Sequence, residues 1–91
     1  MTDGVRDNRD RRRYELDVDG QVVYAAYRRE GGTDYITYVE APPSLRGTGA
    51  AGRLMEGVMA QVRAEGHKVV PICGYAASWL RRHKEHQDLV G

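Results

Sequence analysis

The chain has 91 residues, of which 41% are hydrophobic and 30% are charged, and its formal net charge is +1. This length suffices for one domain with a modest core, and this composition is typical of a globular rather than a disordered chain. The balanced charge gives no whole-molecule field that would attract nucleic acid or an acidic membrane. No apolar run approaches the roughly 18 residues of a membrane span, so we expect no membrane partner.

The first residues of the chain predict neither an export signal nor a packed element. The start MTDGVRDNRDRRR carries charges without the apolar stretch of a signal peptide. Residues 1–12 hold one branched apolar residue, Val5, so we expect a disordered leader before a single domain at residues 13–91. The one cysteine, Cys73, cannot form an internal disulfide, which agrees with a reducing compartment and a cytoplasmic location.

Three strands are predicted in the first half of the domain. Apolar residues alternate from Tyr14 to Val18, and the hairpin signal Asp19-Gly20 follows. The segments 21–29 and 35–40 are rich in β-branched and aromatic residues, and the turn sequence EGGTD separates them. The third strand must end before the two prolines at 42 and 43. These signals predict an antiparallel three-strand meander.

The second half of the domain predicts a helix, a strand and a second helix. Apolar residues at 51, 54, 55, 58, 59 and 62 form a helical stripe, and Gly66 stands where a C-terminal cap belongs. Gly52 and Gly57 each cost about 1 kcal/mol relative to alanine, which indicates close approach to a sheet or a ligand. A strand at 67–72 and a helix at 76–83 follow. The crossover makes the third and fourth strands parallel, so the fold class is α/β (α+β) with two helices.

The stretch PPSLRGTGAAGRLM at residues 42–55 places an arginine and small residues before the first helix. Backbone amides at a helix start have no intrahelical partner and attract anions, and Arg46 adds a charged fork that suits phosphate. A P-loop is a poor fit because Ala50-Ala51 follow Gly49 where lysine and serine or threonine would be needed. A dinucleotide fingerprint lacks its acid further along the chain. The alternative is a tight turn without a ligand.

This stretch resembles a known family. Arg46, Gly49 and Ala51 match the arginine-x-x-glycine-x-alanine signature with which GCN5-related N-acetyltransferases (GNAT) hold the pyrophosphate of acetyl-coenzyme A. In the small single-domain branch of that family, PPxLRGxGxAxxL is followed by KVVPxC and a terminal helix ending in RRH. The corresponding pieces here are PPSLRGTGAAGRL, KVVPIC and WLRRH, within residues 42–83.

The resemblance implies a reduced GNAT fold with acetyl-coenzyme A as its cofactor. The third and fourth strands would splay apart, with the pantetheine arm between them and bonded to the backbone of the third strand. The residues implied in cofactor binding are Val39, Glu40 and Ala41 for the pantetheine arm, and Arg46, Gly47, Thr48, Gly49, Ala50 and Ala51 for the pyrophosphate.

Acetyl transfer to an amine needs a base, donors for the developing oxyanion and a proton for the leaving thiolate. Glu40, at the end of the third strand, is a candidate base, with a solvated surface carboxylate as the alternative. Tyr38 alternates to the same face and stands where the branch usually has a histidine, in YVEAPP instead of an HTEVPP-like run. A phenol of ordinary pKa near 10 is a poor base, so Tyr38 acts as an acid or packs.

Cys73 follows the fourth strand, precedes a helix start and matches the branch's cysteine. It is a candidate acyl carrier, a residue of the acetyl pocket, or a buried side chain without chemistry. Tyr75 and Trp79 are weighed as proton donors for the coenzyme A sulfur, with core packing as the simpler reading. His83 and His86 have a helical spacing that suits metal, but the sequence offers no third ligand, so we expect no metal.

The sequence leaves three functions open. The first is an N-acetyltransferase that acetylates an unidentified amine, either a small molecule or a protein lysine. The second is a non-catalytic acyl-coenzyme A binding or sensing domain. The third, a nucleic-acid module using Arg9 and residues 11–13, is opposed by the interleaved Asp3, Asp7 and Asp10, so we expect no nucleic-acid partner. An exposed edge strand leaves both a monomer and a weak homodimer open.

Overall fold

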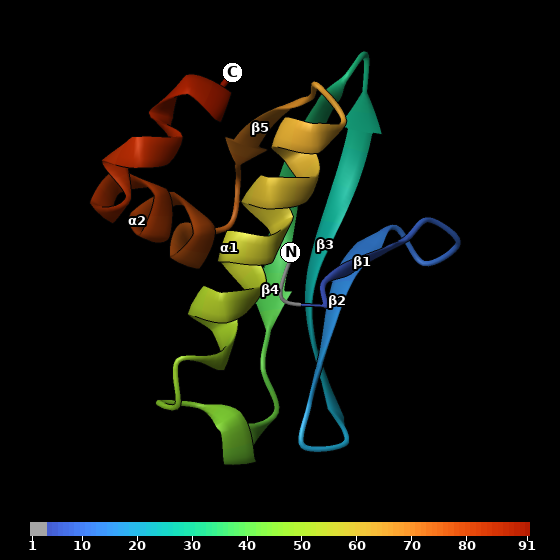
Figure 1. Ribbon diagram of the computed structural model, residues 1–91, viewed down its shortest axis with the longest axis vertical. Helices are drawn as coiled ribbons and strands as arrows, with labels where there is room; N and C mark the ends of the chain where they lie inside the picture. Colours follow the sequence, from blue (N-terminus) through green and yellow to red (C-terminus); the bar gives the residue numbers. More distant parts are fainter. Residues whose placement is uncertain (1–3) are drawn as a thin grey trace.

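The computed structural model describes residues 4–91 and contains one five-stranded sheet whose strands follow the chain order. Neighbouring strands from β1 to β4 are antiparallel, and β4 and β5 are parallel. Figure 1 shows α1 lying across one face of the sheet, with α2 and the C-terminal segment beside it. The strands are β1 (Arg6–Asn8), β2 (Arg13–Val18), β3 (Gln21–Glu30), β4 (Thr33–Glu40) and β5 (Lys68–Pro71); the helices are α1 (Ala50–Ala64) and α2 (Gly74–Arg82), with 3-10 segments η1 (Pro43–Leu45) and η2 (Lys84–Leu89).

The predicted elements of residues 13–91 are present. The Asp19-Gly20 turn has positive φ at both residues, 51° and 76°, as a tight two-residue hairpin requires. The helical stripe, apart from Ala51, is buried on α1 and packs against apolar side chains of β3 and β4 in a single core cluster. Burial of each such Leu, Met or Val side chain contributes about 1.5–3 kcal/mol. No helix within residues 4–91 is long and apolar enough to cross a membrane.

The prediction of a disordered leader is wrong for residues 5–8. Arg6–Asn8 form β1, which pairs with β2 and extends the predicted three-strand meander to four antiparallel strands. Val5 is buried against α1, and Gln61 of that helix donates a side-chain hydrogen bond to the Val5 carbonyl at 2.9 Å. The smallness of Gly57 makes room for this contact, because a Cβ there would lie 2.2 Å from Val5 Cγ2. Residues 1–3, including Asp3, lie outside the described residues.

The second half of β4 diverges from β5, as the family resemblance implied. Pairing of β4 with β5 ends at Ile36 and Pro71, and the Ile36 carbonyl accepts hydrogen bonds from the amides of both Ile72 and Cys73. The chain then turns into α2. On the other side of β4, the register with β3 shifts by one residue at Thr37, which has no partner between the pairs of Ile36 and Tyr38. Such a bulge bends a strand, so residues 37–40 lead away from β5 and towards the start of α1.

Candidate functional site

A cavity of about 420 Å³ opens where the end of β4, the start of α1 and the start of α2 meet. Seven of the nine residues that the resemblance implied in cofactor binding line this cavity. They are Val39, Ala41, Arg46, Gly47, Gly49, Ala50 and Ala51. Leu45, Gly52 and Tyr75 complete the lining. The sequence had indicated close approach at Gly52 and a candidate proton donor at Tyr75, whereas it carried no signal for Leu45. The cavity therefore gathers the small residues of one loop and two residues of β4's end.

The loop before α1 leaves backbone amides available to a ligand. Gly47 and Gly49 have φ values of 80° and 86°, a left-handed conformation that favours glycine. Within residues 4–91, the amides of Gly47, Gly49, Ala51 and Gly52 have no hydrogen-bond partner. Because these unpaired N–H groups lie at the positive end of the α1 dipole, this end of the cavity favours an anion.

Thr48 closes the turn instead of lining the cavity. Its hydroxyl donates to the Leu45 carbonyl at 2.5 Å and accepts a hydrogen bond from the amide of Ala50 at 3.3 Å. These two contacts fix the backbone between the two left-handed glycines. The role of Thr48 in the structure is thus to shape the loop, while its glycine neighbours line the cavity.

Arg46 stands at the mouth of the cavity, and its side chain is 63% exposed. Its Nε donates to the carbonyl of Ala41 at 3.2 Å, and its Nη2 lies 3.6 Å from the Glu40 carboxylate. These contacts fold the side chain back over the end of β4. The guanidinium therefore keeps exposed N–H groups that can turn towards an anion in the cavity.

Glu40 and Tyr38 lie together but not in the cavity. In the register with β3, Val39 is opposite Ala25 on the α1 side of the sheet, whereas Tyr38 and Glu40 are on the other face. The Tyr38 hydroxyl donates to Glu40 Oε1 at 2.7 Å, and this hydrogen bond raises the pKa of the Tyr38 phenol. Tyr38 therefore stays protonated at neutral pH. The two candidate catalytic side chains are on the opposite face of β4 from the cavity lining.

Cys73 and Tyr75 flank the start of α2 and differ in their exposure to the cavity. Cys73 is the N-cap residue of α2, packs half-buried against the core and does not line the cavity. Tyr75 is in the first turn of α2, lines the cavity and is 38% exposed. Its partial burial raises the pKa of the phenol, so the hydroxyl carries its proton at neutral pH. The other candidate proton donor, Trp79, is buried in the core.

The predicted start of the second helix at residue 76 placed Tyr75 before the helix. In the structure α2 begins at Gly74, so Tyr75 belongs to the first turn, beside the start of α1. The glycine directly after Cys73 was the available signal for this earlier start, since glycine is tolerated at a helix N-terminus.

Comparison with known families agrees with the fold and the loop. The model of a family described as GCN5-related N-acetyl-transferase matches residues 13–89. A search of the curated proteins found no match. The matched range covers β2 to η2 and therefore includes the cavity and every residue that lines it. The reduced mixed sheet, with one crossover helix and a divergent β4, is the fold that the resemblance implied. The chain belongs to the GCN5-related N-acetyltransferase family.

Proposed function

We propose that this protein binds acetyl-coenzyme A in the cavity at the start of α1 and transfers the acetyl group to an amine. The observation that carries the proposal is the convergence of unpaired amides, Arg46 and the free edge of β4 on one cavity. The family membership adds the chemistry, since members of this family use acetyl-coenzyme A. We further propose a cytoplasmic protein whose acceptor is a small amine or a protein lysine.

The residues present fit the two polar parts of the cofactor. The amides of Gly47, Gly49 and Ala51 and the Arg46 guanidinium are donors with positive potential, which suit a pyrophosphate. Beyond Ile36, β4 has no β5 partner, so its backbone near Val39 is free to bond the amides of an extended pantetheine arm. The Ala41 carbonyl, which accepts from Arg46 Nε, can join this bonding when the Arg46 side chain turns towards the cavity. When bound, acetyl-coenzyme A supplies an activated thioester carbonyl.

Proton transfers can be assigned to the side chains around β4 and α2. Tyr75 is the group we assign to protonate the departing thiolate, because its neutral phenol is in the cavity. Glu40 is the group we assign to take a proton from the amine, which would approach from the outer face of β4. Tyr38 donates to one oxygen of Glu40 and orients the carboxylate. Cys73, half-buried at the start of α2, stays a proposed acyl carrier.

One observation favours the second candidate, a non-catalytic acyl-coenzyme A binding domain. Among the residues that line the cavity, none is Tyr38, Glu40 or Cys73. A binding domain needs the cavity and the loop, whereas an enzyme also needs a base within reach of the amine. The two candidates therefore make the same prediction for binding and opposite predictions for turnover.

Calorimetric titration of the purified chain with acetyl-coenzyme A tests what the candidates share, with free coenzyme A and ATP as controls. Selective binding of the acetylated cofactor is expected. An absence of binding at millimolar cofactor would mean that the loop is only a turn, and both candidates would fail.

Release of free thiol in the presence of a panel of amines then separates the candidates. We expect turnover that depends on the amine and is lost in Glu40→Gln. Binding without thiol release for any amine class would favour the binding domain. Intact mass after rapid quench tests Cys73, because an acyl carrier gains one acetyl group in the wild type and none in Cys73→Ser.

A further inference from the structure

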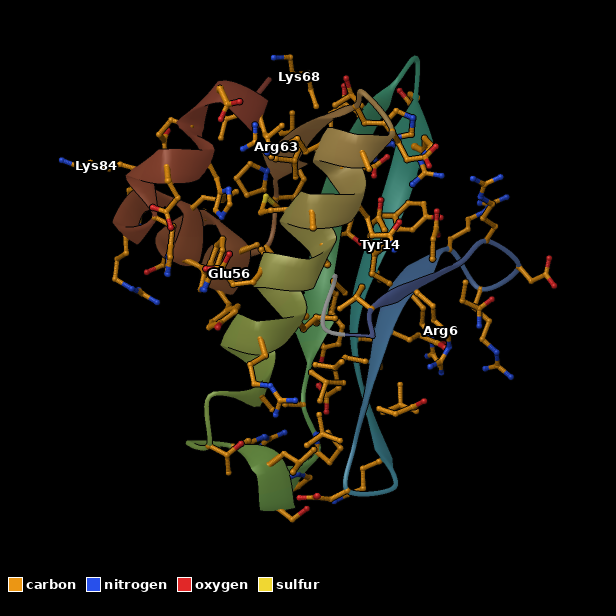
Figure 2. The ribbon with its side chains drawn as sticks, in the orientation of Figure 1. Arg6, Tyr14, Glu56, Arg63, Lys68 and Lys84 are labelled. Atoms are coloured by element: carbon orange, nitrogen blue, oxygen red, sulfur yellow. The ribbon has the colours of Figure 1, made fainter. Side chains whose placement is uncertain are left out.

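A cluster of four side chains lies between α1 and the C-terminal segment, away from the residues that line the cavity. It consists of Glu56 from α1, His83 at the end of α2, and Glu85 and His86 from η2. Ligand atoms of Glu56, His83 and Glu85 all lie within 4.8 Å of one another. Figure 2 shows Glu56 pointing from α1 towards α2. Glu56, which comes from α1, was not among the candidate ligands that the sequence offered beside the two histidines. We call this group the Glu56 cluster.

The orientation of His83 is fixed so that one ring nitrogen faces Glu56. Its Nδ1 lies 2.7 Å from the carbonyl oxygen of Trp79, which can only accept, so Nδ1 carries the hydrogen and donates it. The ring also stacks on Trp79, with 3.8 Å between ring centroids and 14° between planes. The other ring nitrogen, Nε2, lies 4.0 Å from Glu56 Oε2 and carries a lone pair in the neutral tautomer. Metal-binding histidines commonly use their other N–H in this way.

His86 holds the second oxygen of Glu56. Its Nε2 lies 3.0 Å from Glu56 Oε1, and its side chain is only 15% exposed. As a donor to Oε1, His86 leaves Oε2 facing His83. Two acceptors, an imidazole nitrogen and a carboxylate oxygen, therefore face each other across a gap of 4.0 Å. A cation placed between two acceptors attracts both, so this arrangement favours a positive ion at its centre.

We propose that Glu56, His83 and Glu85 bind a divalent zinc ion, with His86 as the residue that positions Glu56. One imidazole nitrogen and two carboxylate oxygens are a donor set that zinc accepts, whereas magnesium and calcium prefer oxygen alone. The Lys84 side chain, next to the cluster in the sequence, extends away from the body of the molecule. It therefore does not neutralise the carboxylates of Glu56 and Glu85.

The spacing also suits a small cation. Around tetrahedral zinc, bonds of about 2.0–2.1 Å place neighbouring ligand atoms roughly 3.3 Å apart. The 4.0 Å gap between His83 and Glu56 closes to this value with a shift of less than 1 Å. Glu56 and Glu85 are 45% and 60% exposed, so their side chains are free to make that shift. A bound ion would link α1 to the end of α2 and to η2. Tyr75 lies in the first turn of the same α2 helix.

The test is zinc titration of the full, untagged chain after chelator treatment, followed by calorimetry and by the fluorescence of Trp79. Trp79 is the only tryptophan and stacks on His83, so its emission reports directly on the cluster. We expect one zinc ion per chain and, with cobalt as a spectroscopic substitute, visible absorption bands of a bound ion. Glu56→Gln and His83→Gln should each lower the affinity at least about tenfold, and His86→Gln by about 10–100-fold.

Matched controls separate this site from adventitious binding. Glu65→Gln and His67→Gln change the same residue types outside the cluster, and Cys73→Ser removes the one thiol; all three should keep the wild-type zinc affinity. An absence of saturable binding at millimolar zinc would overturn the proposal, as would equal affinity in Glu56→Gln. Neither the zinc titration nor its controls use acetyl-coenzyme A, so this test is independent of the proposed acetyltransferase activity.

Discussion

The two ends of β4 hold polar groups that are used in opposite ways. Near its start, the fully buried Asp34 accepts hydrogen bonds from the Tyr14 hydroxyl at 2.5 Å and from Arg29 Nε and Nη2 at 2.6 and 3.0 Å. Near its end, the loop that follows leaves the amides of Gly47 and Gly49 unpaired at an open cavity. The polar groups at one end are satisfied by side chains of the chain itself, whereas those at the other end are unpaired and open to the cavity.

The difference separates a buried cluster that stabilises the fold from the loop that we propose as the binding site. Burial opposes ionisation of Asp34, but hydrogen bonds from Arg29 and Tyr14 outweigh it and hold the pKa of the carboxyl below its ordinary value. Arg29 also lies 3.2 Å from Asp7, so the pairing joins the N-terminal segment to β3 and β4. We expect substitutions near Asp34 to change folding and substitutions near Gly49 to change binding.

The largest effect is expected for Asp34→Ala. The change leaves Arg29 without its main buried partner, and breaking such a pair destabilises a fold by about 3 kcal/mol or more. Urea unfolding followed by Trp79 fluorescence measures the loss. Asp88→Ala is the control, because it breaks the exposed pair of Asp88 with Arg63 and should leave the midpoint near that of the wild type. Similar midpoints for the two variants would contradict a stabilising role of the Asp34 cluster.

Arg46→Ala should have the largest effect at the other end. Loss of a charge-assisted contact to the cofactor would weaken acetyl-coenzyme A binding by about 1.5–3 kcal/mol, with the unfolding midpoint unchanged. Calorimetry measures the affinity. Arg53→Ala removes an exposed arginine from the first turn of α1 and is the matched control. Unchanged affinity in a folded Arg46→Ala variant would remove Arg46 from the site.

Gly57→Ala tests the folding side of α1 by steric conflict. A Cβ at this position would meet Val5 Cγ2 at 2.2 Å, so we expect destabilisation of about 1–3 kcal/mol with normal cofactor affinity. The double variant Val5→Ala/Gly57→Ala relieves the clash and should recover part of the loss. Full stability of Gly57→Ala alone would show that Val5 does not pack there in solution.

Gly52→Ala should give the opposite result on the same helix. A Cβ at Gly52 lies 3.6 Å from Trp79 Nε1, an ordinary contact, and alanine favours the helix by about 1 kcal/mol. Gly52 also lines the cavity, so the added methyl group should lower cofactor affinity. Stability and affinity are measured on the same preparation. Reduced stability with unchanged affinity would reverse the contrast between the two glycines.

The smallest effect is the acid dependence of stability. Asp34 has a lower pKa in the folded chain than in the unfolded chain, where it is about 3.9. Its ionised form therefore stabilises the fold above that value, and the contribution is lost as pH falls through the folded pKa. Unfolding free energies below pH 4 should fall more steeply in the wild type than in Asp34→Asn. Equal dependence of the unfolding free energy on pH in the two proteins would mean that other carboxylates cause the loss of stability in acid.

Local sequence signals predicted most of the fold and most of the cavity. The Asp19-Gly20 hairpin, the amphipathic α1 and the loop from Arg46 to Ala51 are each encoded by residues a few positions apart. Their backbone preferences act within one turn of chain, so spacing alone indicates them. The same loop carried the family resemblance, because the arginine and the glycines that form it are consecutive in the chain.

Tertiary structure alone decided the contacts between distant residues. Val5 against Gly57, Tyr75 at the cavity, and Glu56 beside His83 join segments whose spacing in the chain carries no signal of the contact. The bulge at Thr37 decided which face of the sheet carries Tyr38 and Glu40. One extra residue in a strand moves every side chain after it to the opposite face. Packing between elements depends on shape and register summed over the whole core, and no short stretch of sequence contains that information.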